Sequence, residues 1–148
     1  MHPFDLRAAL LASHAQHVVL IHFPIALFIT GFVFDVLAQR SHRYELAETA
    51  YYNLLAAAIF SIPTILTGLI AWQWALEGHK LKGILLYHLL FALASGVVIV
   101  GSWWLHFRAR RRAAPAPLWR ITVELAGVLL LMVTGHLGGF LSGVNGAP

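Results

Sequence analysis

The sequence predicts an all-α membrane protein built as a bundle of four transmembrane helices. Of its 148 residues, 59% are hydrophobic and only 11% are charged, whereas soluble globular chains carry about 25% charged residues. Four apolar stretches are long enough to cross a lipid bilayer, which takes roughly 20 residues each. Because only helices satisfy their own backbone groups in lipid, we expect residues 1–148 to form a single integral membrane domain.

The four predicted spans follow one another closely along the chain. The first covers about residues 18–39 and carries no charge from HVVLIHFPIAL through FITGFVF until Asp35. Pro24 lacks the N–H that would bond Leu20, so we expect the helix to bend or to start its regular part there. The other spans cover about 47–75, 82–107 and 118–142. The second is long enough to tilt in the bilayer.

Basic residues are unequally divided between the two sides of the predicted bundle. Seven of the ten lysines and arginines lie in the first and third loops: Arg40, Arg43, Arg108, Arg110, Arg111, Arg112 and Arg120. By the positive-inside rule, these loops are cytoplasmic and both termini are periplasmic. The basic run at residues 108–112 abuts a span, so we expect it to be attracted to anionic lipid headgroups. We expect no nucleic-acid partner.

Histidines lie at a similar depth near the periplasmic ends of three predicted spans. His22 is inside the first span, and His88 and His136 are each roughly 9 Å from the outer ends of the third and fourth spans. A single histidine of this kind can have the purely structural role of a hydrogen bond between helices. Three at one depth indicate a ligand site, since ionisable residues within a membrane mark functional sites. The chain has no cysteine, which excludes iron–sulfur clusters and covalently attached haem.

A weak internal repeat matches two of these histidines. HFPIAL, which starts at His22, aligns with HLLFAL, which starts at His88. A Thr–Gly pair at 67–68 aligns with another at 134–135. Both hairpins begin on the same side, so the repeat would be parallel. In this register His22 and His88 face each other across the bundle, an arrangement that can hold a planar cofactor between two imidazoles.

Two carboxylates lie towards the cytoplasmic ends of their spans. Arg120 precedes Glu124 by four residues, so we expect the two to pair on one helix face. Asp35 is expected to meet an arginine of the first or third loop. His106 is expected to have an interfacial role. We interpret both carboxylates as structural anchors.

Several motifs resemble the family called domain of unknown function 2231, a group of short predicted membrane proteins of bacteria. They are H-x4-H-F-P-I-A-L in the first span, T-G-L before a tryptophan in the second, a lone histidine in the third and T-G-H-L-G-G in the fourth. The matching positions are His17, His22, Pro24, Asp35, Gly68, Trp72, His88, His136, Gly138 and Gly139. The family usually has an acidic residue where this chain has Ala71. The resemblance implies a bacterial inner-membrane location and a redox setting, since some members are joined to cytochrome c-like or Rieske-like modules.

Together these features predict a b-type haem protein that relays electrons near the periplasmic face. The predicted cofactor-binding residues are His22, His88, His17, His136, Arg7 and Lys82. The first two would ligate the iron, the next two would hold a propionate, a quinone head group or a second haem, and the basic pair would meet the propionates.

The predicted partners are the lipid bilayer, quinone, and a periplasmic redox protein or a larger respiratory or photosynthetic complex. In such a complex the chain would be an electron-transfer subunit rather than a stand-alone enzyme. Two alternatives stay open. One is a non-redox structural or assembly subunit whose histidines only bond between helices. The other is a histidine-based transition-metal site, because neutral imidazole also suits copper and zinc.

Overall fold

The computed structural model describes residues 13–75, 80–112 and 117–143, and these residues are helical apart from short connections. The helices are α2 (Ser13–Leu20), α3 (His22–Ser41), α4 (Tyr44–Ala75), α5 (Gly83–Arg111) and α6 (Arg120–Leu141). The segments long and apolar enough to cross a membrane are Gln16–Ser41, Tyr44–Gln73, Gly83–Arg111 and Arg120–Leu141. The predicted all-α bundle with four spans is therefore confirmed, with span ends that differ by a few residues.

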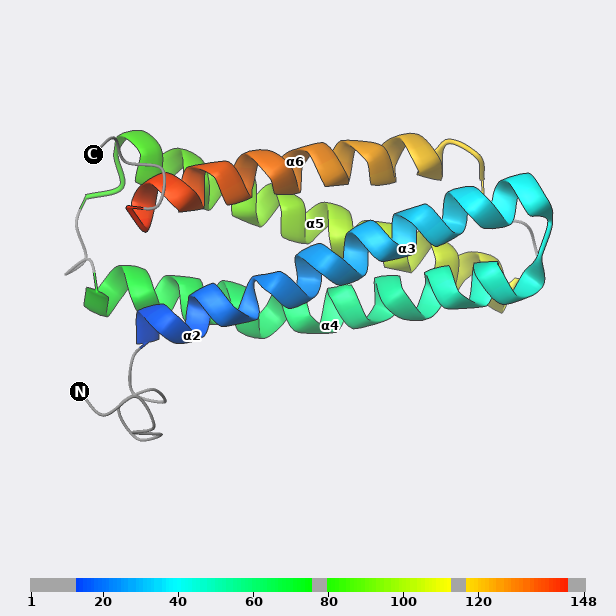
Figure 1. The fold of residues 1–148 in the computed structure, drawn as a ribbon, viewed down its shortest axis with the longest axis horizontal. Coiled ribbons are helices and arrows are strands. Elements are labelled where there is room, and N and C mark those ends of the chain that lie inside the picture. The colour runs from blue at the N-terminus through cyan, green and yellow to red at the C-terminus, as the bar shows by residue number, and fades with distance from the viewer. Residues whose placement is uncertain (1–12, 76–79, 113–116, 144–148) are drawn as a thin grey trace.

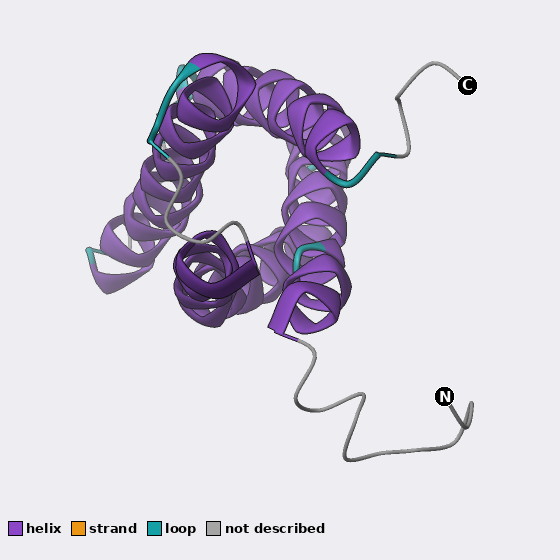
Figure 2. Ribbon diagram, turned by 90° about the vertical axis from the view of Figure 1, so that its left-hand side faces the viewer, coloured by secondary structure: helices purple, strands orange, loops and turns teal. Residues whose placement is uncertain are grey.

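The helices run up and down along one long axis (Figure 1). α2 begins and α6 ends at the same end of the bundle, so both halves of the chain start from one side (Figure 1). Seen along the axis, the helices surround a common centre (Figure 2). α3 packs mainly on α4, and α5 packs on α6 and α4, whereas α3 and α6 touch much less. We call the end with His17 and His88 the histidine end, and the end with Asp35 and Arg120 the ion-pair end.

The first span is interrupted once, at Ile21, between α2 and α3. Pro24 has no N–H, so the carbonyl of Leu20 loses its helical partner. The hydroxyl of Thr64 on α4, which donates to the carbonyl of Phe60 at 2.8 Å, also lies within hydrogen-bond distance of this carbonyl oxygen, at 3.3 Å. The helix restart predicted from Pro24 is thus confirmed, and the freed carbonyl ties the first span to α4 near the histidine end.

The hydrophobic core lies midway along the bundle. Its buried members are Phe28, Leu54, Ala57, Ala58, Ile99 and Leu131. A Cβ atom at Gly127 would stand 2.7 Å from the ring of Phe28, so glycine allows α6 to approach this ring. Small residues at helix contacts and large apolar residues on the outer surface are typical of helices that pack within lipid.

The two halves of the chain bury residues at matching positions. Four buried residues of α3 correspond in order to four buried residues of α5: Pro24 to Ser95, Phe28 to Ile99, Gly31 to Ser102, and Asp35 to His106. In α4 and α6 they are Ala50 and Arg120, Leu54 and Glu124, Ala57 and Gly127, and Ser61 and Leu131. The shift along the chain is 71 residues for the first set and 70 for the second.

These matches support a parallel repeat, but in a register other than the one predicted from the sequence. The prediction that His22 corresponds to His88 is wrong, because the buried positions match only when His17 corresponds to His88. His22 then corresponds to Leu93. The sequence match failed because it aligned the short H-x-x-x-A-L similarity, whereas packing repeats the spacing of buried residues.

Candidate functional site

A cavity of about 370 Å³ lies between the helices at the histidine end. Its volume falls in the range of about 300–1,000 Å³ that is typical of small-molecule sites. Its wall is mainly apolar and includes small residues of three helices: Gly68, Ala92, Gly96, Gly135, Gly138 and Gly139. His17, His22 and His88 line this cavity. The structure therefore brings together three of the four histidines that the sequence predicts to hold a cofactor.

His17 projects from α2 towards α4. Its Nδ1 lies 3.1 Å from the carbonyl oxygen of Thr64 and 3.3 Å from the hydroxyl oxygen of Thr67. A Cβ atom at Gly68 would stand 2.9 Å from His17 Cε1, closer than side-chain carbons approach one another. The missing side chain at Gly68 therefore makes room for this imidazole.

His88 repeats this arrangement between α5 and α6. Its Nδ1 lies 3.1 Å from the carbonyl oxygen of Thr134, and a Cβ atom at Gly138 would stand 3.2 Å from His88 Cε1. The Thr134 hydroxyl also lies 3.2 Å from the hydroxyl of Ser95. Each half of the chain thus holds one histidine against a threonine carbonyl, with a glycine four residues further along the same helix.

The carbonyl partners determine where each ring carries its proton. A carbonyl oxygen can only accept, so Nδ1 of His17 and of His88 must donate. In a neutral imidazole this leaves Nε2 without a proton and with the lone pair that binds a metal. An Nδ1–H bonded to a backbone carbonyl is the usual support of a metal-bound histidine, since it fixes both tautomer and ring orientation.

The cavity wall follows the repeat. Corresponding positions of both halves contribute to it, including His17 and His88, Ile21 and Ala92, Thr64 and Thr134, Gly68 and Gly138, and Trp72 and Ser142. The cavity therefore presents one supported imidazole from each half of the chain to a common space.

The other two predicted histidines differ from this pair. His22 lines the cavity, but it is exposed, and its Nδ1 lies 2.7 Å from the carbonyl of Val18 on the preceding turn. His136 is exposed and lies outside the described cavity wall. Its ring meets Phe140 edge to face, with centroids 5.0 Å apart. Each of these two contacts joins the ring to a residue four positions away along the chain.

The predicted basic residues lie at or beyond the margin of the site. Arg7 falls outside the described residues. Lys82 is the exposed residue just before α5, and its neighbour Leu81 lines the cavity. Lys82 is therefore near the mouth of the cavity rather than in its wall.

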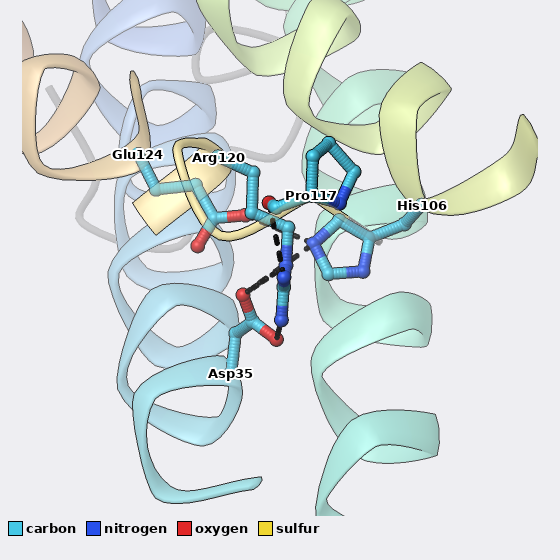
Figure 3. Close-up of polar contacts among 5 residues, drawn as sticks. All are labelled: Asp35, His106, Pro117, Arg120 and Glu124. Atoms are coloured by element: carbon cyan, nitrogen blue, oxygen red, sulfur yellow. Dashed lines mark hydrogen bonds and ion pairs between the residues drawn. The ribbon is translucent and has the colours of Figure 1, made fainter. Parts of the chain in front are cut away.

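A second polar cluster occupies the ion-pair end (Figure 3). Arg120 donates from Nε and Nη2 to the two carboxylate oxygens of Asp35, at 2.8 and 2.9 Å. His106 Nε2 lies 2.9 Å from Glu124 Oε1 and 3.7 Å from Asp35 Oδ2. All four side chains are buried.

The cluster bears on the predictions made for Arg120, Asp35 and His106. The spacing suggested that Arg120 can pair with Glu124 on its own helix, whereas its guanidinium forms its two hydrogen bonds to a carboxylate across the bundle, with Asp35 of α3. The prediction that Asp35 meets an arginine of the third loop is confirmed by Arg120. His106 is buried between two carboxylates, so the interfacial role predicted for it is wrong. Intramembrane charge at matching depths was the signal that could have found this cluster.

The comparisons with known proteins identify a family. The family model described as predicted membrane protein, DUF2231, matches residues 13–147. No curated protein and no solved structure matches the chain.

Proposed function

The chain belongs to the DUF2231 family of predicted membrane proteins, and we propose that it binds one b-type haem in the cavity at the histidine end. His17 and His88 are the proposed axial ligands. The observation that carries this proposal is the matched pair of imidazoles on one cavity wall, each held through Nδ1 by a threonine carbonyl.

The residues present fit such a group. Two neutral imidazoles with supported Nδ1 atoms form a haem donor set, and the apolar wall suits a porphyrin. Gly68 of α4 and Gly138 of α6 make room for the two imidazoles themselves. When held by these two imidazoles, a haem would supply one-electron transfer.

The chain's own groups have distinct tasks in this proposal. The carbonyls of Thr64 and Thr134 would fix the orientation and the tautomer of the two rings that hold the iron. The apolar wall excludes water from the bound group. The exposed Lys82 at the cavity margin is available to a propionate.

The distribution of charge supports an orientation for this site. The described arginines in the last turns of α3 and α5 and just after them lie at the ion-pair end, and the positive-inside rule assigns such an end to the cytoplasm. We therefore place the haem near the periplasmic face of a bacterial inner membrane, with both termini periplasmic. The partners that fit are quinone in the lipid and a periplasmic redox protein or respiratory complex.

Purification in mild detergent tests the haem proposal. Protein made in haem-sufficient cells is expected to carry non-covalent protohaem with a six-coordinate, low-spin visible spectrum. A folded but colourless protein would contradict the proposal and favour a structural subunit. Bound copper or zinc in place of iron would favour a histidine-based metal site.

The glycine beside His17 gives a second prediction. Gly68→Ala should displace the imidazole, because the new Cβ atom would meet Cε1 at 2.9 Å. Disturbing the support of a metal ligand typically costs 10–100-fold in affinity, so a loss of at least about 10-fold is expected in titrations of haem into the haem-free protein. Gly101→Ala on α5 is the control, since a Cβ atom there meets nothing within 4 Å. Equal losses in both variants would count against the role of Gly68.

A further inference from the structure

The polar cluster at the ion-pair end contains two pairs with different properties. In the first pair, Arg120 binds both oxygens of Asp35 and donates a further bond to the carbonyl of Pro117 at 3.1 Å. The opposite charges of this pair cancel, and both carboxylate oxygens have a donor. It is a closed ion pair of the kind that buried charges require.

The second pair is incomplete. Glu124 is fully buried, and its Oε1 contacts His106 Nε2 at 2.9 Å. Its Oε2 has no hydrogen-bond partner among the described residues. An ionised carboxylate with an oxygen that lacks a donor is very costly in a buried site, whereas a neutral carboxyl is less so. The geometry therefore favours a protonated Glu124 whose Oε1–H donates to His106.

The charge count of the cluster also calls for one proton on the second pair, and the oxygen of Glu124 that lacks a donor favours the carboxyl as its carrier. With Arg120 and Asp35 cancelling, one proton on the second pair makes the whole cluster neutral. Without this proton, two buried carboxylates would face one guanidinium. With a second proton, the cluster would carry a net positive charge. Either departure is unfavourable in a medium of low dielectric constant.

No charged group of α4 completes the second pair. The α4 positions that correspond to Arg120 and Glu124 are Ala50 and Leu54, and both are apolar and buried. The acidic residue Glu48 of α4 pairs instead with Arg110, in a partly exposed contact. The amide of Gln39 can face Arg120, and the carbonyl of Pro117 accepts a hydrogen bond from it, so both of these groups belong to the first pair.

A metal ion would be the other occupant to consider, because ligating atoms of Asp35, His106 and Glu124 lie within 4.8 Å of one another. The guanidinium of Arg120 already occupies both oxygens of Asp35. A cation would have to displace it or lie beside a fixed positive charge. The cluster therefore fits a proton better than a metal ion.

We propose that Glu124 carries one exchangeable proton within the membrane at the ion-pair end and donates it in a hydrogen bond to His106. Asp35 and Arg120 form the fixed neutral pair that keeps the stored charge balanced. The site lies at the opposite end of the bundle from the cavity, and the proposal does not depend on a haem there.

Infrared difference spectra between the purified wild-type protein and its variants test this site at neutral pH. The wild-type protein is expected to show the C=O stretching band of a protonated carboxyl, which shifts to lower frequency in heavy water. Glu124→Gln should remove the band, and the amide can still bond His106, so the fold should persist. His106→Phe should keep the band but move it to higher frequency, because the carboxyl loses its acceptor. Glu48→Gln, the control carboxylate on α4, should leave the band unchanged.

Several results would overturn the proposal. Absence of the band at neutral pH would show that Glu124 is ionised. A band that does not shift in heavy water would show that the proton is not exchangeable, and a band that Glu48→Gln removes would assign it to another residue. Loss of the band on addition of zinc ions alone would assign the cluster to a metal ion.

Discussion

Replacing either His17 or His88 by alanine is expected to abolish the low-spin haem spectrum. Each substitution removes one of the two proposed axial ligands, so the remaining imidazole cannot give a six-coordinate bis-histidine centre. The haem affinity should fall by more than the roughly 10–100-fold that is typical of changes behind a ligand. The purified variants should therefore carry less haem than the wild-type protein. Visible spectra and the haem-to-protein ratio measure both effects.

Two other histidines provide matched controls for this experiment. His22→Ala changes a histidine on the same cavity wall whose Nδ1 bonds its own helical turn. His136→Ala changes one that lies outside the described wall. Both variants should keep the low-spin spectrum. If His22→Ala abolishes the spectrum and His17→Ala preserves it, the pair predicted from the sequence alone is right and the repeat register has no bearing on the ligands.

Arg120→Met is expected to destabilise the protein by about 3–5 kcal/mol, the usual cost of removing one partner of a buried ion pair. The substitution leaves the carboxylate of Asp35 buried beside Glu124 without its two charge-assisted hydrogen bonds. Adding Asp35→Leu should recover most of the loss, because replacing both charges with apolar residues is often neutral or stabilising. Unfolding of the detergent-solubilised protein measures each change.

The pair formed by Arg110 and Glu48 gives the comparison for this prediction. Its side chains are 40% and 24% exposed, and partly exposed ion pairs typically contribute less than about 1 kcal/mol. Arg110→Met should therefore have a small effect. If Arg120→Met and Arg110→Met are equally mild, the ion pair of Asp35 does not hold α3 to α6.

The fold could be predicted from the sequence because it depends on properties that a sequence displays directly. The length of each apolar run and the scarcity of charge identify the four spans. Pro24 predicts the restart of the first helix, because a missing N–H acts locally. The ends of the spans are less certain, since apolarity does not show where the last hydrogen-bonded turn closes.

The register of the repeat could not be predicted in the same way. His17 and His22 precede similar apolar runs, and only the helix contacts show which of them corresponds to His88. The decisive signal was a threonine followed by glycine four residues later, at Thr64 and Gly68 and again at Thr134 and Gly138. The match predicted from the sequence paired adjacent Thr–Gly residues instead, so α6 was shifted by three positions relative to α4.

The ion-pair end shows a different limit. Arg120 can reach either Glu124 on its own helix or Asp35 across the bundle, and sequence spacing favours the first. The structure shows the second, because Asp35 offers both oxygens to the planar guanidinium. Glu124 is then left to His106, a contact between residues of α5 and α6 that no local spacing predicts.

The haem content per chain, combined with electron paramagnetic resonance of the ferric protein, tests most directly whether the cavity holds one haem. The two halves of the chain are proposed to supply one imidazole each to a single iron. We expect one haem per chain, with a low-spin bis-imidazole signal that neither His17→Ala nor His88→Ala retains. Two haems per chain, or a low-spin bis-imidazole signal that survives in either variant, would contradict this proposal.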